Sequence, residues 1–130
     1  MGESQIQIAL DYGSFCFHGC AGKVTIGELG LTTIDYRVAG GDLVIVLRHN
    51  RVAVLRTTSA RYRTSSGIGV GSTVRTTTAT WNGFRRLACA GGTAVWLRSG
   101  TTVVTRLHTA GGVVRSVELR LRALPHATTC

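Results

Sequence analysis

Pairs of glycine separate the apolar runs of this chain, and they constrain its fold more than any other feature. Gly40-Gly41, Gly91-Gly92 and Gly111-Gly112 each stand between alternating or apolar runs rich in Val, Thr, Leu and Arg. Glycine readily adopts the positive φ that tight hairpin turns require. The runs are too short for ordinary helices, and Val and Thr suit a pleated surface. The spacing predicts a mainly β fold of antiparallel hairpins, arranged as one sheet system or as a sandwich or barrel.

The same reasoning locates the strands. The predicted strands cover residues 5–12, 23–26, 33–38, 42–48, 52–57, 86–89, 94–98, 102–109 and 113–122. His49-Asn50 and Ser99-Gly100 are further predicted turns. A chain of 130 residues is long enough for one domain with a buried core. We therefore expect a single domain over residues 1–130, with a weak internal repeat of a β-rich unit at about 23–60 and 61–122.

One segment departs from the hairpin pattern. Gly67, Gly69 and Gly71 alternate along it. Ser72 and Thr73 then supply hydroxyls that can cap a helix, and Ser72 is the expected cap. Asn82-Gly83 is a reasonable helix stop. The pattern predicts one short helix within residues 72–81. Threonine is a weak helix former and dominates this stretch, so a strand stays open as the alternative.

The segment also carries a resemblance. The run Gly67-Ile-Gly-Val-Gly-Ser-Thr73 resembles a segment of secreted, mostly uncharacterised actinobacterial proteins. The likeness extends over residues 36–121. The layout is distantly similar to the helix-plus-sheet repeats of secreted β-lactamase inhibitory proteins and of small outer-membrane assembly lipoproteins, although the threonine run replaces the charged and Ala residues of their helix. The resemblance implies an extracellular binding module and transfers no catalytic residue.

Four cysteines bear on the compartment. Cys16, Cys20, Cys89 and Cys130 form an even set in a small Gly- and Thr-rich chain, which favours two disulfides and an oxidising environment. Three pairings are open, and Cys16–Cys20 with Cys89–Cys130 is favoured because the second bond would tie down the C-terminal tail. The start of the chain lacks the basic and apolar regions of a signal peptide. We expect an extracellular protein whose signal has been removed, with a cytoplasmic protein as the alternative.

The charge balance points to anionic partners. The formal net charge is +9, and Lys23 is the one lysine among fifteen basic residues. Such a chain attracts an acidic protein or an anionic polymer. The arginines are spread along the chain, which is typical of a solvated β face, so nucleic-acid binding should be weak. The longest apolar run, residues 43–47, is far too short to span a membrane.

The motifs that carry chemistry are largely missing. The glycine segment lacks the Gly-Lys-Ser/Thr ending of a phosphate loop and the spacing of a dinucleotide fingerprint. The acids are scattered, and no nucleophile elbow is present. Cys16 and Cys20 with His18 between them suit a disulfide better than a zinc site, which requires four ligands. We expect no enzyme, no metal and no cofactor.

Aromatic and arginine side chains supply the predicted contact surface. Trp81, Phe84, Arg85 and Arg86 lie close in sequence, and Trp96 joins them if the strands align. Trp and Arg dominate the energetics of protein interfaces. The alternative is that Trp81 covers the core beneath the helix. The leading hypothesis is a secreted binding or inhibitor-like module of unknown oligomeric state, and the second is an Arg-rich nucleic-acid- or polyanion-binding domain.

Overall fold

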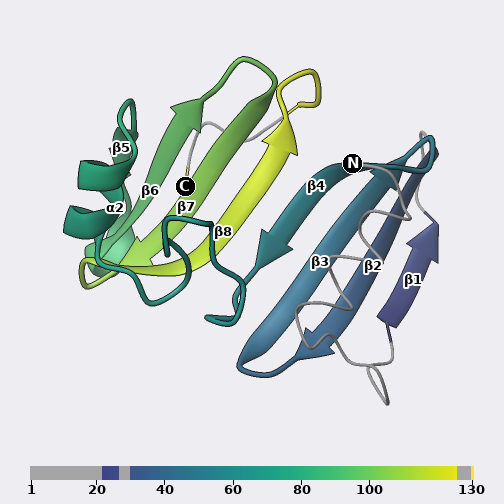
Figure 1. The fold of residues 1–130 in the computed structure, drawn as a ribbon, viewed down its shortest axis with the longest axis horizontal. Coiled ribbons are helices and arrows are strands. Elements are labelled where there is room, and N and C mark those ends of the chain that lie inside the picture. The colour runs from purple at the N-terminus through teal and green to yellow at the C-terminus, as the bar shows by residue number, and fades with distance from the viewer. Residues whose placement is uncertain (1–21, 27–29, 126–129) are drawn as a thin grey trace.

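The structure, a computed structural model, describes residues 22–26, 30–125 and 130. Eight strands form one antiparallel sheet in the order β1-β2-β3-β4-β8-β7-β6-β5 (Figure 1). The strands are β1 (Gly22–Ile26), β2 (Leu31–Val38), β3 (Gly41–Arg48), β4 (Arg51–Thr57), β5 (Arg85–Ala88), β6 (Thr93–Ser99), β7 (Val103–Ala110) and β8 (Val113–Leu121). One helix, α2 (Val74–Thr80), precedes β5, and a 3-10 turn (Ala90–Gly92) joins β5 to β6.

The predicted fold class is confirmed: the described chain is mainly β with a short helix, and its strands form a single sheet. Each half of the sheet is a meander of consecutive strands, and the halves join where β4 pairs with β8. The predicted strand at 5–12 lies outside the described residues. The single domain over 1–130 and the repeat at 23–60 and 61–122 stay predictions.

The predicted turns form where the backbone can turn tightly. His49 and Asn50 connect β3 to β4 with φ values of 52° and 59°. Gly111 and Gly112 connect β7 to β8 with φ values of 59° and 74°. Positive φ at both central residues is the geometry whose twist matches that of the flanking strands. These turns therefore fix the pairing of neighbouring strands.

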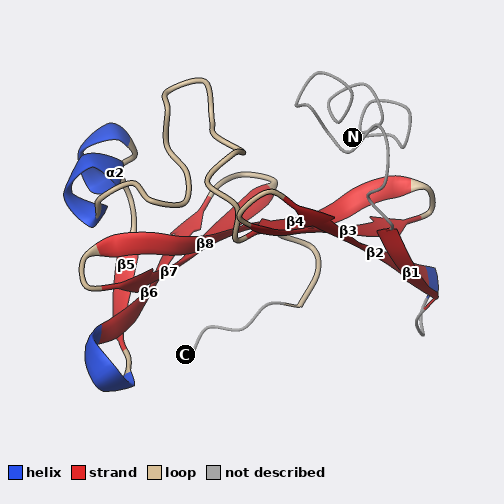
Figure 2. Ribbon diagram, turned by 90° about the horizontal axis from the view of Figure 1, so that it is seen from below, coloured by secondary structure: helices blue, strands red, loops and turns tan. Residues whose placement is uncertain are grey.

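The sheet has two chemically different faces. One face, which we call the apolar face, carries the buried cluster of Leu43, Ile45, Leu47 and Val52. The segment between β4 and β5, including α2, lies over this side of the sheet (Figure 2), and Tyr62 from this segment packs against the cluster. The opposite face, the polar face, carries charged side chains of β4, β7 and β8. An antiparallel sheet commonly packs one face and leaves the other to solvent.

The glycine-rich segment after β4 is hydrogen-bonded to the start of β8. The Gly71 N–H donates to the Val114 carbonyl (2.8 Å), and the Val114 N–H donates to the Ser72 carbonyl (2.9 Å). The Arg63 guanidinium donates to two carbonyls of the same segment (2.9 and 3.3 Å). The side chain of Ile68, in the middle of this segment, is buried. The segment is therefore an ordered cover of the apolar face.

The predicted helix is present, but its predicted cap is wrong. Thr73 is the N-cap, and its hydroxyl accepts the Thr76 N–H (3.1 Å). The Ser72 hydroxyl instead accepts the Gly69 N–H (3.1 Å), because the Ser72 backbone is already paired with β8. Three later threonine hydroxyls donate to carbonyls one turn back, at 2.8 to 2.9 Å. In the part of the chain that the structure describes, no helix is long and apolar enough to cross a membrane.

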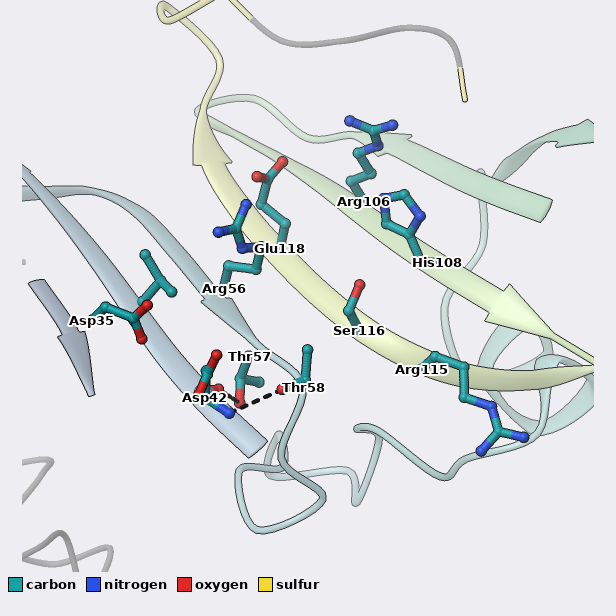
Figure 3. A pocket seen from close by; sticks show the side chains of 11 residues that line it. Asp35, Asp42, Arg56, Thr57, Thr58, Arg106, His108, Arg115, Ser116 and Glu118 are labelled. Atoms are coloured by element: carbon teal, nitrogen blue, oxygen red, sulfur yellow. Dashed lines mark hydrogen bonds between the residues drawn. The ribbon is translucent and has the colours of Figure 1, made fainter. Parts of the chain in front are cut away.

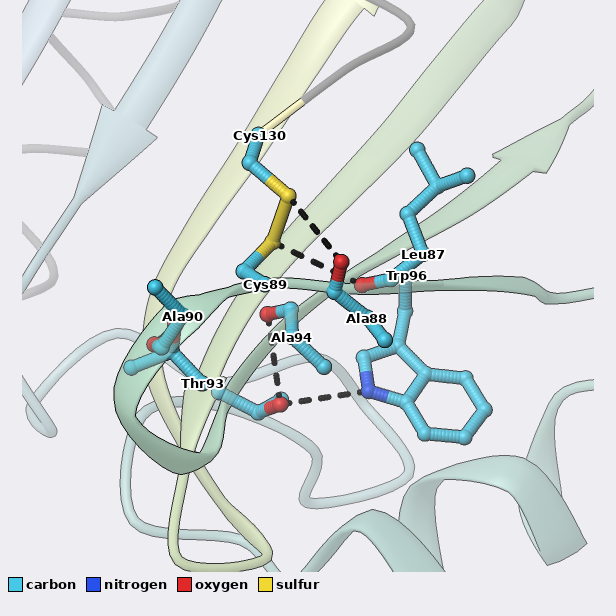
Figure 4. The surroundings of a disulfide bond; sticks show 9 residues. Leu87, Ala88, Cys89, Ala90, Thr93, Ala94, Trp96 and Cys130 are labelled. Atoms are coloured by element: carbon cyan, nitrogen blue, oxygen red, sulfur yellow. Dashed lines mark hydrogen bonds between the residues drawn. A yellow bond between two sulfur atoms is a disulfide. The ribbon is translucent and has the colours of Figure 1, made fainter.

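One predicted disulfide is confirmed. Cys89 and Cys130 are bonded, with their Cα atoms 5.9 Å apart (Figure 4). The bond fastens the C-terminal residue beside the turn that joins β5 to β6. The other predicted pair, Cys16 with Cys20, lies outside the described residues.

Gly69 should not tolerate a side chain. A Cβ there would stand 2.7 Å from the Tyr62 carbonyl oxygen and 3.1 Å from the Arg63 side chain. We expect Gly69→Ala to lower the free energy of unfolding by about 1–3 kcal/mol, because a backbone atom must move. Gly67→Ala is the control: its Cβ meets open space, although the φ of 81° still costs about 1 kcal/mol. Urea unfolding of both variants measures the difference, and equal losses would contradict the close approach.

The disulfide should stabilise the fold through the unfolded chain. Its two cysteines are 41 residues apart. Breaking it with Cys130→Ser should cost about 3–4 kcal/mol in the chain-entropy model and lower the melting temperature clearly. Adding Cys89→Ser should cost little more, since the bond is already lost. Melting followed by circular dichroism tests this, and an unchanged melting temperature in Cys130→Ser would contradict it.

Candidate ligand groove on the polar face of the sheet

Charged side chains meet on the polar face where the two halves of the sheet join. Arg56 of β4 and Arg106 of β7 are register partners of Glu118 of β8, one on each side of it. Residues directly opposite each other in an antiparallel sheet project from the same face. Glu118 is only 8% exposed. A nearly buried carboxylate therefore stands in a cross-strand row between two arginines (Figure 3).

This row forms the floor of a groove of about 540 Å³, which we call the polar groove. Strands β2, β3, β4, β7 and β8, with the start of the segment after β4, supply its lining. The lining holds three acids, three arginines, one histidine, three hydroxyl side chains and Val44 (Figure 3). It draws on both halves of the sheet, so it exists only because β4 and β8 pair.

The groove gathers the acids of an otherwise basic surface. Asp35, Asp42 and Glu118 line it, and they are the only Asp and Glu side chains in the described part of the chain. Arg37 and Arg120, outside the lining, ion-pair with two of them: Arg37 Nε lies 3.6 Å from Asp42 Oδ1, and Arg120 Nη2 lies 3.3 Å from Glu118 Oε1. Counted with these two partners, the groove carries two more cations than anions.

The charges are separated along the groove. Asp35 and Asp42 lie on β2 and β3, and we call this the acidic end. Arg106, His108 and Arg115 lie on β7 and β8, and we call this the basic end. Figure 3 shows the two groups on opposite sides of β4. The groove is therefore bipolar, with the Arg56–Glu118 pair of positions between its ends.

A β-bulge places Arg115 at the basic end. His108 pairs with Ser116 and Thr109 pairs with Val114, so Arg115 is an extra residue of β8 without a position opposite it. Bulges of this kind re-aim a side chain relative to a regular strand. The bulge gives the basic end an exposed arginine, whereas the alternation of a regular strand would have directed this side chain to the other face of the sheet.

His108 titrates in a cationic setting. Partial burial lowers the pKa of His108 below its ordinary value of 6.5, and the Arg106 guanidinium lowers this pKa further. The Glu118 carboxylate acts in the opposite direction, and Arg56 again lowers the pKa. The imidazole therefore binds its proton less readily than a free histidine does.

The lining offers several kinds of binding group. His108 and Ser116 are opposite each other, yet no hydrogen bond joins their side chains in the described structure. Among the described residues, no three His, Cys, Asp or Glu side chains gather as a metal site. What the groove presents is guanidinium forks, carboxylates and hydroxyls, which recognise charged and hydrogen-bonding ligands.

The predicted contact residues form two aromatic pairs. Trp81 and Phe84 stack with ring centroids 6.3 Å apart, and the Arg86 guanidinium lies 5.9 Å from the centre of the Trp96 ring. Arg85, the neighbour of Arg86 in β5, is exposed. The Arg86–Trp96 pair lies on the two strands at the β5 edge, whereas Trp81 reaches over β4 and β8, and none of these residues lines the polar groove.

Trp81 and Trp96 are both engaged in packing. Trp81 lines an apolar cavity of about 270 Å³ with Tyr62 and side chains of β4 and β8, so it covers part of the apolar face. The Trp96 indole N–H donates to the Thr109 hydroxyl (3.2 Å). A contact surface made of all five predicted residues stays a prediction.

Sequence reasoning did not select the residues of the polar groove. Alternation within a strand predicts which residues share a face, and Arg106 and His108 could have been paired by that signal. The pairing of β4 with β8 joins segments about sixty positions apart and leaves no local pattern in the sequence. The bulge at Arg115 is likewise invisible to alternation.

The comparisons with known proteins bear on the fold. No family model matches the chain, and no curated protein matches it. A similar fold occurs in the crystal structure of a cysteine-rich secretory protein from Staphylococcus aureus, with a TM-score of 0.60 and 10% sequence identity. The match covers 90% of this chain and 42% of that protein's chain, so this chain spans less than half the length of that protein. At this identity the likeness shows the fold alone.

The pKa of His108 is directly measurable. We expect an imidazole titration by NMR to give a pKa below 6.5 for His108. This pKa should be lower still in Glu118→Gln and higher in Arg106→Gln, because these variants remove opposite charges.

The lowered pKa also affects stability, because the unfolded chain binds more protons than the folded one just below pH 6.5. The contribution of His108 to stability is therefore present above pH 6.5 and is lost as the pH falls through the depressed value. Arg61→Gln, on the segment after β4, is the control variant and should leave the pKa of His108 unchanged. A wild-type pKa of His108 at or above 6.5 would contradict this electrostatic account.

Proposed function

We propose that this chain is a non-catalytic binding module that acts outside the cell and holds its partner in the polar groove. An inhibitor-like role is one form of such binding, in which the module covers a partner's functional surface. The predicted extracellular setting and the predicted absence of catalysis both belong to this proposal.

The extracellular part of the proposal is supported by two observations. The Cys89–Cys130 bond belongs to the kind of crosslink that persists in oxidising compartments. The similar fold from Staphylococcus aureus belongs to a protein described as secretory. The segment that resembles secreted actinobacterial proteins is consistent with both.

The observation that carries the binding role is the contrast between the two faces. The helix and the segment after β4 lie over the apolar face (Figure 2), whereas the residues that line the polar groove come from the strands and from the first residue after β4. Single charged residues on an exposed strand need no explanation, but the gathering of the described acids in one groove of a +9 chain does. A groove that combines both signs of charge supplies specificity for a partner's surface.

A nucleic-acid or polyanion role is the second candidate, favoured by the excess of cations around the groove. Arginine recognises phosphate and sulfate as well as carboxylate. Binding that depends on net charge alone weakens steeply with salt, and we expect that behaviour with duplex or single-stranded DNA.

The binding role is tested by blocking the groove without changing its charge. Immobilised protein is exposed to the culture medium of the organism that encodes it, and retained proteins are quantified. We expect Ser116→Trp, which places a bulky side chain in the groove, to retain at least about tenfold less of the main bound protein, equivalent to about 1.4 kcal/mol. Circular dichroism and melting confirm that the variant folds.

Two further variants serve as controls for the position of the bulky side chain and for the predicted contact residues. Ala79→Trp places the same side chain on exposed α2 and should retain the partner as well as wild type does. Arg85→Ala/Arg86→Ala removes the charges of the predicted contact residues. Loss of retention in that variant with full retention in Ser116→Trp would contradict the groove and favour the β5 edge. A wild-type protein that retains nothing would contradict the binding role.

A further inference from the structure

The polar groove has charges of opposite sign at its two ends, which restricts the ligands that fit it. The acidic end holds Asp35 and Asp42, and the basic end holds Arg106, His108 and Arg115. At the acidic end, Asp35 Oδ1 is buried and has no hydrogen-bond partner among the described residues. A buried acceptor of this kind gains free energy when a ligand supplies a donor.

A uniform polyanion fits this arrangement poorly. A nucleic acid or a sulfated polysaccharide that lies along the groove satisfies the basic end but brings its negative charges against Asp35 and Asp42. Like charges placed close together across an interface cost several kcal/mol. Two cations stand opposite these acids in the register, Lys23 of β1 opposite Asp35 and Arg37 opposite Asp42. Arg37, the ion-pair partner of Asp42, offsets the repulsion only partly, because its side chain is 90% exposed.

A polypeptide can match both ends. Its acidic side chain can accept hydrogen bonds from the guanidinium groups of Arg106 and Arg115, and its basic side chain can donate to Asp35. Between the ends, the hydroxyls of Ser116 and Thr58 line the groove and suit a peptide backbone, which carries both donors and acceptors.

The strand order sets the length of such a segment. The acidic end begins on β2 and the basic end on β7, which are four strand spacings apart in the sheet. At about 4.8 Å per spacing this is about 19 Å across the strands. An extended chain covers that distance with about six residues.

We propose that the polar groove binds an extended segment of a partner protein that carries an acidic residue at one end and a basic residue about six positions away. This inference rests on the proposed function and specifies the chemistry of its partner. The segment runs across the strands of the sheet, with its acid at the basic end of the groove and its base at the acidic end.

Three synthetic peptides of equal length test the proposal at physiological ionic strength. The mixed peptide carries Glu at one end and Lys at the other, with neutral polar residues between them. The acidic peptide carries Glu at both ends and the basic peptide Lys at both ends. Fluorescence anisotropy should show the mixed peptide binding at least about tenfold more tightly than either of the others, a difference of about 1.4 kcal/mol.

Isosteric variants assign each end. Asp35→Asn/Asp42→Asn should abolish the preference of the groove for the mixed peptide over the acidic one. Arg106→Gln/Arg115→Gln should abolish its preference for the mixed peptide over the basic one. Arg61→Gln/Arg75→Gln removes the same net charge from the segment after β4 and α2, and it should leave the order of the three affinities unchanged.

The outcomes distinguish a failure of this inference from a failure of the proposed binding function. If wild type binds the acidic peptide or duplex DNA as tightly as the mixed peptide, the inference is overturned in favour of a polyanion site. If the mixed peptide shows no preference while Ser116→Trp still loses its captured partner, the inference is overturned and the binding function stands. If Ser116→Trp keeps its partner, the binding function itself fails at this groove.

Discussion

The pairing of β4 with β8 is the interaction on which the rest of the structure depends. It joins two meanders that are each closed by local turns, and it spans only four register positions, from Val54–Arg120 to Thr57–Val117. It brings Arg56 opposite Glu118 and makes one face continuous across both halves of the sheet. Because the contact is non-local, its chain-entropy cost is recovered only once side chains on both faces pack.

The two faces of the joined sheet meet this requirement in different ways. The apolar face buries Leu43, Ile45 and their neighbours under Tyr62, and the glycine-rich segment is held against β8 by backbone hydrogen bonds. The polar face leaves Arg56 and Arg115 exposed and buries Glu118, whose charge is compensated by Arg120 at 3.3 Å. Burying a carboxylate costs free energy unless a cation and hydrogen bonds compensate it. The apolar face therefore supplies a covered hydrophobic cluster, whereas the polar face combines buried valines such as Val54 and Val104 with a surface of defined charge.

The proposed function follows from this difference between the two faces of the sheet. The cover and the disulfide fix the sheet from its apolar side and at its C-terminal residue, and neither lies in the polar groove. A rigid sheet can hold charged side chains at fixed spacings without ordering them anew when a partner arrives, and that lowers the entropic cost of binding. The predicted contact residues differ in this respect, because Trp81 also packs over β4 and β8 and the Trp96 indole is hydrogen-bonded to Thr109 of β7.

Local chemistry in the sequence determined most of the elements. Glycine pairs and His49-Asn50 determined the hairpins, because a preference for positive φ is a property of single residues. The pairing of Cys89 with Cys130 was also predicted correctly. The N-cap was mispredicted as Ser72 because the backbone of that residue is claimed by β8, a partner distant in sequence. The tertiary structure alone decided the strand order, the bulge at Arg115 and hence the polar groove. Its charged residues come from five strands, and only pairing between the two halves brings them onto one face.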